Sequence, residues 1–246
     1  MPISKHLVDE ITVWIREQVY GAGCRGVVLG ISGGVDSAVT AGLAARALGA
    51  EAVLGLIMPC HSISQDEKHA RLVTETFEIE WDRVDLTSAF DALVALLPPG
   101  QGLAVANVKP RLRMATLYYY ANLRRYLVIG TSNRTELSVG YFTKYGDGGS
   151  DFLPLGDLFK SEVCDLAREI GVPPSIIEKA PSGGLWEGQT DEGEMGIAYE
   201  TLDGVLQALG AGDAAGLEPG DVALVKRMMA ASEHKRAALP IFRVRR

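Results

Sequence analysis

Hydrophobic residues along the chain form two kinds of pattern, and segments of the two kinds alternate. Apolar residues three or four apart, typical of an amphipathic helix, begin near Ile3 and continue to Val19. Short apolar runs, typical of buried strands, cover residues 26–29, 52–58, 79–84 and 126–129, and helical patterns at 36–48, 65–77 and 86–97 separate them. Strands that alternate with helices predict an α/β fold, a doubly wound and mostly parallel sheet with helices on both faces.

Beyond residue 100 the chain is predicted to be mainly helical. Pro110 fits the first turn of a long helix that continues through Tyr120, because its missing N–H costs little there. Residues 141–155 are rich in Gly and Asp without a period, which predicts a long functional loop. Further helices are expected at 158–170, 191–209 and 221–232. Because neither an internal repeat nor a domain linker is evident, we expect a single domain over residues 1–246.

Composition excludes several classes of protein. No apolar run is long enough for a membrane span, and the first residues lack the pattern of a signal peptide. The three cysteines, Cys24, Cys60 and Cys164, are too scattered for a disulfide framework or a Cys-x-x-Cys pair. We therefore expect a cytoplasmic protein without a membrane partner. A net charge of −7 argues against a broad surface for nucleic acid, although a local basic cluster could still bind a small anion.

The segment after the first predicted strand carries the clearest chemistry. Residues 30–37 read Gly-Ile-Ser-Gly-Gly-Val-Asp-Ser and join that strand to a helix, so backbone N–H groups and the helix N-terminus can cradle a phosphate. Asp36 would repel a phosphate unless Mg²⁺ lay between them. The lysine of a Walker A loop is missing, which argues against an ordinary P-loop NTPase. A tight turn without a ligand is the alternative interpretation.

A second predicted strand end points to the same place. Gly130 to Asn133 follow the strand at 126–129, and ligands in parallel sheets gather at the carboxyl ends of the strands. Glu136 lies just beyond and is a second carboxylate that could share a metal ion with Asp36. Alone, either acid would be interpreted as a solvated surface charge. Together they predict a metal pair.

The motifs resemble those of a known family. Residues 32–37 resemble the pyrophosphate loop of ATP pyrophosphatases, and within that group residues 107–114, 130–136, 140–147 and 181–192 are similar to the ammonia-dependent NAD synthetases. His234, Lys235 and Arg236 match the C-terminal signature of that family. The resemblance runs in order across nearly the whole chain.

This resemblance implies a set of site residues. ATP would be bound by Gly30, Ile31, Ser32, Gly33, Gly34, Val35, Asp36, Ser37, Thr131, Lys160 and Ser182. Mg²⁺ would be bound by Asp36 and Glu136, deamido-NAD by Arg111, Lys144, Asp151, His234 and Lys235, and the catalytic residues would be Asp36, Lys160 and Asp151. Two alternatives stay open. Arg111 and Lys160 could be solvated helix cations, and Asp151 could either accept a hydrogen bond from a hydroxyl or orient ammonia.

The implied reaction is that of a ligase. ATP would adenylate the nicotinate carboxylate of deamido-NAD with loss of pyrophosphate, and ammonia would then displace AMP to give NAD. Little chain precedes the first helix, so we expect no glutaminase domain and free ammonia, or ammonia from a separate protein, as the nitrogen donor. Residues 60–65 and 182–192 are candidates for segments that cover the intermediate. The resemblance also implies a homodimer, for which the first helix and the helix after Pro110 are candidate surfaces.

Three other functions are considered. One is a related ATP pyrophosphatase that acts on a different carboxylate. Another is a tRNA-thiolating enzyme, against which the lack of paired cysteines and of a basic surface argues. The third is a non-catalytic nucleotide-binding protein, which Asp36, Glu136 and Lys160 disfavour without excluding it.

Overall fold

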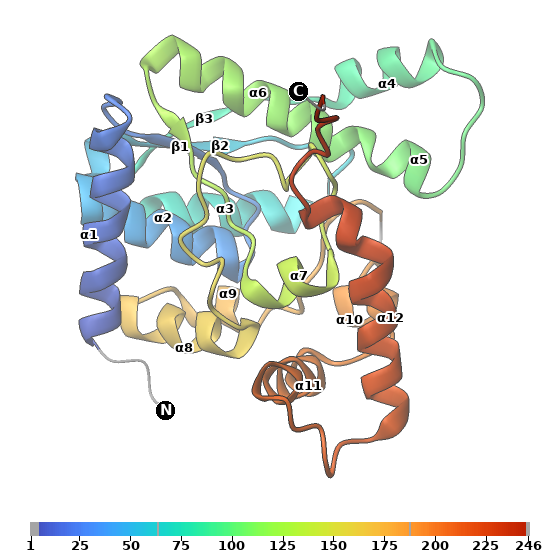
Figure 1. The fold of residues 1–246 in the computed structure, drawn as a ribbon. Helices are drawn as coiled ribbons and strands as arrows, with labels where there is room; N and C mark the ends of the chain where they lie inside the picture. The colour runs from blue at the N-terminus through green and yellow to red at the C-terminus, as the bar shows by residue number, and fades with distance from the viewer. Residues whose placement is uncertain (1–4, 63, 187, 245–246) are drawn as a thin grey trace.

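A parallel sheet forms the centre of the protein. The computed structural model describes residues 5–62, 64–186 and 188–244. Within them, the strands β1 (Val27–Gly30), β2 (Val53–Ile57), β3 (Glu80–Arg83) and β4 (Leu127–Val128) lie in the order β3-β2-β1-β4 (Figure 1). The pairs β1–β2, β1–β4 and β2–β3 are all parallel. The predicted α/β fold class is confirmed.

Helices cover both faces of this sheet. On one face lie α1 (Lys5–Gly21), α2 (Val35–Leu48) and α3 (Ser64–Thr76), and on the other α4 (Thr87–Ala95), the short α5 (Leu103–Ala106) and α6 (Val108–Arg124). The alternation of strand side chains accounts for this, because Val27 and Leu29 join one hydrophobic cluster and Val28 joins the other. A 3₁₀ turn, η1 (Ala50–Ala52), connects α2 to β2.

The remaining helices follow β4 in the chain. They are α7 (Arg134–Val139), α8 (Lys160–Ile170), α9 (Pro174–Ile177), α10 (Asp191–Met195), α11 (Tyr199–Ala211) and α12 (Pro219–Arg236). Helix α8 packs on α2, while α11 packs on both α7 and α8 (Figure 1). A separate hydrophobic cluster that includes Val139, Leu202 and Val225 holds α7, α11 and α12 together.

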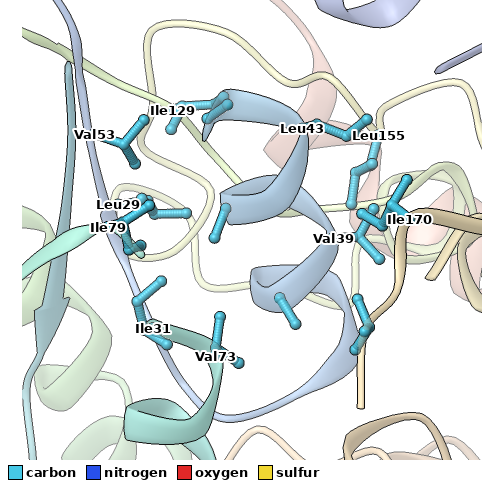
Figure 2. Close-up of a cluster of buried hydrophobic side chains, with 14 of the residues drawn as sticks. Leu29, Ile31, Val39, Leu43, Val53, Val73, Ile79, Ile129, Leu155 and Ile170 are labelled. Carbon is cyan, nitrogen blue, oxygen red and sulfur yellow. The ribbon is translucent and has the colours of Figure 1, made fainter. Parts of the chain in front are cut away.

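Helix α2 is enclosed on nearly all sides. Ten of its fourteen residues are buried, so it lacks the polar face of a surface helix. Figure 2 shows Val39 and Leu43 of this helix pointing toward Leu155 and Ile170, while strand residues such as Leu29 lie on the other side of the helix. This burial fixes the position of the N-terminus of α2, which carries the predicted phosphate loop.

Most predicted elements agree with the structure to within a few residues. One prediction was wrong, because the helix expected over 191–209 is two helices, α10 and α11. Gly196 ends α10 in a left-handed conformation, with φ of 72°, and the carboxylate of Glu192 accepts a hydrogen bond from the backbone N–H of Tyr199 at 2.8 Å. The chain therefore turns and starts a new helix. The loop predicted at 141–155 is confirmed as lacking a regular element, and the start of the first predicted helix lies outside the described residues.

Helices α5, α7 and α9, each of four to six residues, were not predicted. Among the described residues, no helix combines the length and the hydropathy that a membrane crossing requires.

Truncation of a side chain in the core around α2 tests this architecture. Leu43 is fully buried, so Leu43→Ala should lower the free energy of unfolding by about 2–5 kcal/mol through lost burial and a residual cavity. Leu96, which is 83% exposed at the end of α4, provides the control: Leu96→Ala should change stability by less than about 0.5 kcal/mol. Urea denaturation followed by circular dichroism measures both. Equal effects of the two variants would contradict the packing described for α2.

Candidate active site at the carboxyl ends of β1 and β4

The two predicted strand-end segments lie side by side. Strands β1 and β4 are neighbours in the sheet and run parallel, so their carboxyl ends share one edge. The segment after β1 leads into α2, and the segment after β4 leads into α7. The two are in contact, because Nδ2 of Asn133 donates a hydrogen bond to Oδ1 of Asp36 at 2.9 Å.

The loop between β1 and α2 is held by its own serines. Ser37 Oγ accepts a hydrogen bond from the N–H of Ser32 and donates one to the carbonyl oxygen of Gly34, at 3.3 and 2.9 Å. Gly33 has φ of 77°, and a Cβ there would lie 2.6 Å from the backbone oxygen of Asp66. A glycine is therefore required, because both the conformation and the contact with α3 exclude a side chain. The N-terminus of a fourteen-residue helix lies directly behind this loop.

Three charged side chains meet beside the loop. Asp36 is the second residue of α2, Glu136 lies in α7, and Lys160 begins α8. The ammonium of Lys160 forms an ion pair with Asp36 and lies 3.8 Å from Oε1 of Glu136. Only 5% of the lysine side chain is exposed, and the two carboxylates are largely buried. Two carboxylates thus share one ammonium in a site with little access to water.

This arrangement affects the protonation of both partners. Burial raises the pKa of Glu136 to about 8, and the nearby carboxylate of Asp36 acts in the same direction. Burial by itself would lower the pKa of Lys160, but Asp36 and Glu136 outweigh it and the pKa is raised. The lysine therefore stays an ammonium, while Glu136 holds a proton to higher pH than an exposed carboxyl group does.

Asn133 connects the two carboxylates. Its side chain accepts a hydrogen bond from the N–H of Glu136 at 2.9 Å, while a carboxylate oxygen of Glu136 accepts one from the N–H of Asn133 at 3.3 Å. This capping box begins α7. The same side chain bonds Asp36, so one asparagine positions both acids. The spacing Asn-x-x-Glu is the signal in the sequence by which this role could have been found.

The donor set at this edge fits Mg²⁺. Across the described residues, no group of three or more His, Cys, Asp or Glu side chains is arranged to hold a metal ion. Mg²⁺, however, is commonly bound through one or two carboxylates together with substrate phosphates and water. Asp36 and Glu136 supply oxygen donors beside the loop that is predicted to bind phosphate, so this donor set fits Mg²⁺.

Two tyrosines and a third carboxylate lie next to Lys160. The ring of Tyr199, at the start of α11, lies 5.0 Å from the ammonium of Lys160. The hydroxyls of Tyr199 and Tyr141 each donate a hydrogen bond to Asp191 at 3.1 Å. Burial raises the pKa of Asp191 and of both tyrosines. This group was not predicted from the sequence. In the sequence alone, an aromatic residue at the start of a helix looks the same whether it belongs to a site or to the hydrophobic core.

Four of the residues predicted to bind the second substrate lie in one neighbourhood. The guanidinium of Arg111 donates to the backbone oxygen of Lys144 at 3.3 Å, and Nζ of Lys144 donates to the backbone oxygen of His234. Lys235 donates to the backbone oxygens of Gly140 and Phe142 at 2.7 and 2.9 Å, and burial lowers its pKa. These contacts join α6, the loop at 141–155 and the end of α12.

The other predicted residues are more dispersed. Both carboxylate oxygens of Asp151 are used within the chain, one by the N–H of Val128 at 2.7 Å and one by the hydroxyl of Tyr118 at 3.1 Å, at the β4 edge of the sheet. Burial, assisted by that carboxylate, raises the pKa of Tyr118 to about 12. Thr131 is half-buried in the segment after β4, and Ser182 is exposed. The roles of Asp151, Thr131 and Ser182 stay predictions.

The segment at 182–192, predicted to cover the site, contacts α6. Lys109 is buried, and its ammonium donates a hydrogen bond to the backbone oxygen of Leu185 at 2.7 Å. Gln189 accepts a hydrogen bond from the N–H of Leu185 at 2.8 Å. Lys109 was not singled out from the sequence. The candidate covering segments also contain residues 63 and 187, which lie outside the described residues.

Comparison with known proteins decides the family. The model of the NAD synthase family matches residues 7–239. The chain belongs to the NAD synthase family. It is 48% identical over 233 residues to a protein of Carboxydothermus hydrogenoformans named NH(3)-dependent NAD(+) synthetase, with 93% of each chain covered. A protein of the same name from Archaeoglobus fulgidus is 48% identical over 241 residues, with 97% of each covered.

Solved structures agree with this assignment. An NMN synthetase from Francisella tularensis has a TM-score of 0.89 and 37% identity, with 98% of this chain and 100% of that chain covered. An NH3-dependent NAD synthetase from Campylobacter jejuni has a TM-score of 0.86 and 32% identity, with 97% and 98% covered. A glutamine-dependent NAD+ synthetase from Acinetobacter baumannii has a TM-score of 0.69 and 25% identity, and this chain covers 46% of its length.

The role assigned to Asn133 can be measured as stability. Asn133→Ala removes the cap of α7 and the hydrogen bond to Asp36, so the free energy of unfolding should fall by about 0.5–2 kcal/mol. Asn122, which is exposed on α6, is the control, and Asn122→Ala should have an effect within about 0.5 kcal/mol. Denaturant unfolding compares the two. If Asn133→Ala were no more destabilising than the control, the capping role would be wrong.

Proposed function

We propose that this protein is a ligase that converts deamido-NAD, ATP and ammonia into NAD, AMP and pyrophosphate. The observation that carries the proposal is the cluster of Asp36, Glu136 and Lys160 beside the loop at the N-terminus of α2. That cluster combines an anion-binding helix end with a lysine and two carboxylates suited to a metal ion. Its place in a chain of the NAD synthase family supports the choice of substrates.

Activation of the carboxylate explains the need for ATP. A carboxylate is a poor acyl donor because oxide is a poor leaving group. In the proposed reaction a nicotinate carboxylate oxygen attacks the α-phosphorus of ATP, and the bond to pyrophosphate breaks. Ammonia then attacks the carbonyl carbon of the acyl-adenylate, AMP leaves with the bonding electron pair, and a proton is lost from nitrogen. No covalent bond to the protein is required.

The chain supplies charge stabilisation for the first step. The N–H groups at the start of α2 bind phosphate oxygens, and Lys160 provides an ammonium that burial deprives of competing water. Asp36 and Glu136 would hold Mg²⁺, which when bound neutralises phosphate charge that these carboxylates would otherwise repel. Asn133 keeps the two acids in place.

The second substrate is assigned to the neighbouring basic group. Arg111 and Lys144 are cations near each other, and an arginine suits bidentate contact with a diphosphate. His234 extends this group from α12 through its contact with Lys144. Lys235 has its hydrogen bonds directed to backbone oxygens, so we assign it to holding the loop at Gly140 and Phe142 beside the substrate. Asp151, which lies at the β4 edge of the sheet, is also assigned to deamido-NAD.

Ammonia is proposed as the nitrogen donor. The relatives from Carboxydothermus hydrogenoformans and Archaeoglobus fulgidus, both named NH(3)-dependent NAD(+) synthetase, match nearly the whole chain, which supports this donor. The acyl-adenylate must be protected from water until ammonia attacks. The segment at 182–192, which Lys109 contacts at Leu185, is the proposed cover. We propose a cytoplasmic setting, as the sequence predicts.

A direct assay tests the proposal. The protein is incubated with ATP, Mg²⁺, deamido-NAD and ammonium, and we expect NAD and AMP to form in equal amounts. Glutamine in place of ammonium should give no product. ATP consumption without NAD would contradict the substrate, and a strong preference for nicotinate mononucleotide would instead favour the activity in the name of the Francisella tularensis structure. Absence of AMP under all conditions would favour a nucleotide-binding protein.

Replacement of one site carboxylate tests the mechanism. Asp36→Ala should lower kcat for AMP formation by about 10²-fold or more, because Lys160 and the metal site both lose a partner. Asp165 on α8 is the matched control, since it forms an exposed ion pair with Arg168. Asp165→Ala should keep kcat within about twofold. Circular dichroism verifies that both variants fold. Near-normal turnover by Asp36→Ala would overturn the metal and ATP assignment.

We further propose that the protein forms a homodimer. Helix α1 exposes Val13, Trp14 and Tyr20, and α6 exposes Tyr119 and Leu123, so both predicted surfaces carry large apolar side chains. Light scattering should give about twice the chain mass of 26.3 kDa. Leu123→Glu and Trp14→Glu test the two surfaces separately. A monomer at all concentrations would contradict the proposal.

A further inference from the structure

The first N–H groups of α8 are capped by side chains from other helices. Helix α8 begins with Lys160, and the residue before it, Phe159, has no side-chain oxygen with which to cap the helix. The N–H of Lys160 donates to Oγ1 of Thr135 at 2.9 Å, and the N–H of Ser161 donates to Oδ2 of Asp203 at 2.9 Å. Helix α7 and helix α11 therefore supply the caps.

Asp203 joins these two caps into one network. It lies on α11 with 3% of its surface exposed, and its second carboxylate oxygen accepts a hydrogen bond from the hydroxyl of Thr135. Thr135 is fully buried, so its hydroxyl donates to Asp203 while it accepts from the N–H of Lys160. Buried polar networks of this kind are rigid when every member is paired.

The network is directly connected to the charged cluster of Asp36, Glu136 and Lys160. Thr135 directly precedes Glu136, and the capped N–H belongs to Lys160, whose ammonium pairs with Asp36. Helix α11 also contributes Tyr199, whose ring lies 5.0 Å from that ammonium. Helix α11 thus contacts the end of the lysine side chain through Tyr199 and the backbone of the next residue, Ser161, through Asp203.

We infer that Asp203 is a positioning residue that sets Glu136 and Lys160 relative to Asp36 for the reaction. The inference rests on the proposed function and deepens it, since Asp203 acts only through Thr135 and the N-terminus of α8. A carboxylate is required because two donors converge on it, the hydroxyl of Thr135 and the N–H of Ser161. An asparagine offers only one oxygen, and its amino group cannot accept a hydrogen bond.

Enzyme kinetics of variants in this hydrogen-bond network test the inference. Asp203→Asn and Thr135→Val should each lower kcat by about 10- to 100-fold, because small displacements of a reacting geometry are costly. The KM for deamido-NAD should stay within about twofold, since the basic group at Arg111 is not contacted. Thr135→Ser keeps the hydroxyl and should restore most of kcat. The double variant should be no slower than the slower single variant, because both break one network.

A structural control separates positioning from stability. Val205 is buried on the same helix as Asp203, so Val205→Ala should lower the melting temperature without lowering kcat below about half. A loss of melting temperature in Asp203→Asn with kcat retained, as in the control, would show a purely structural role and overturn the inference. Additive losses of kcat in the double variant would also overturn it.

Amide hydrogen exchange gives a readout that needs no activity. In Asp203→Asn the amides of Lys160 and Ser161 should exchange at least about tenfold faster than in Val205→Ala, because their caps are weakened. Unchanged exchange at these two amides would overturn the inference even if the wild-type enzyme is active. Failure of the wild-type protein to form NAD would instead overturn the proposed function, whatever the exchange data show.

Discussion

The site depends on two buried carboxylates that share one buried ammonium. Charges removed from water are stable only when they are paired and hydrogen-bonded, so Asp36, Glu136 and Lys160 constrain one another and the elements that carry them. Helices α2, α7 and α8 therefore have to meet at one point. Hydrogen bonds from Asn133, Thr135 and Asp203 hold the ends of these helices there. The two carboxyl groups also place oxygen donors at this point, which suits the proposed Mg²⁺.

The fold was predictable because its signals are local. Apolar runs and helical spacing located the strands and the longer helices to within a few residues, and the rule for parallel strands brought the segments after β1 and β4 together. The break between α10 and α11 was not predicted, since a glycine inside a helical pattern can either be tolerated or end the helix. Only the left-handed conformation of Gly196 distinguishes the two cases.

For the site, the sequence singled out residues that lie in recognisable motifs, and their roles stay predictions. A carboxylate in a glycine-rich loop is conspicuous, and Asp36, Glu136 and Lys160 do come together in space. Lys109, Tyr199 and Asp203 escaped, because each gains its role from a partner distant in the chain: a backbone oxygen at residue 185, an ammonium at 160 and a helix N-terminus at 161. No local pattern marks such a residue, and its significance appears only when the helices are packed.

The separation of the site residues along the chain also bears on folding. The contacts of Asp36 with Asn133 and with Lys160 span 97 and 124 residues, so they close large loops and belong to the slow, non-local part of folding. During synthesis, the loop before α2 emerges long before the side chains that balance its charge. In a chain whose α7 and α8 have not yet formed, Asp36 therefore lacks these two partners. The arrangement of Asp36, Asn133 and Lys160 is therefore complete only once α7 and α8 have packed beside the start of α2, so the site forms late although its loop is made early.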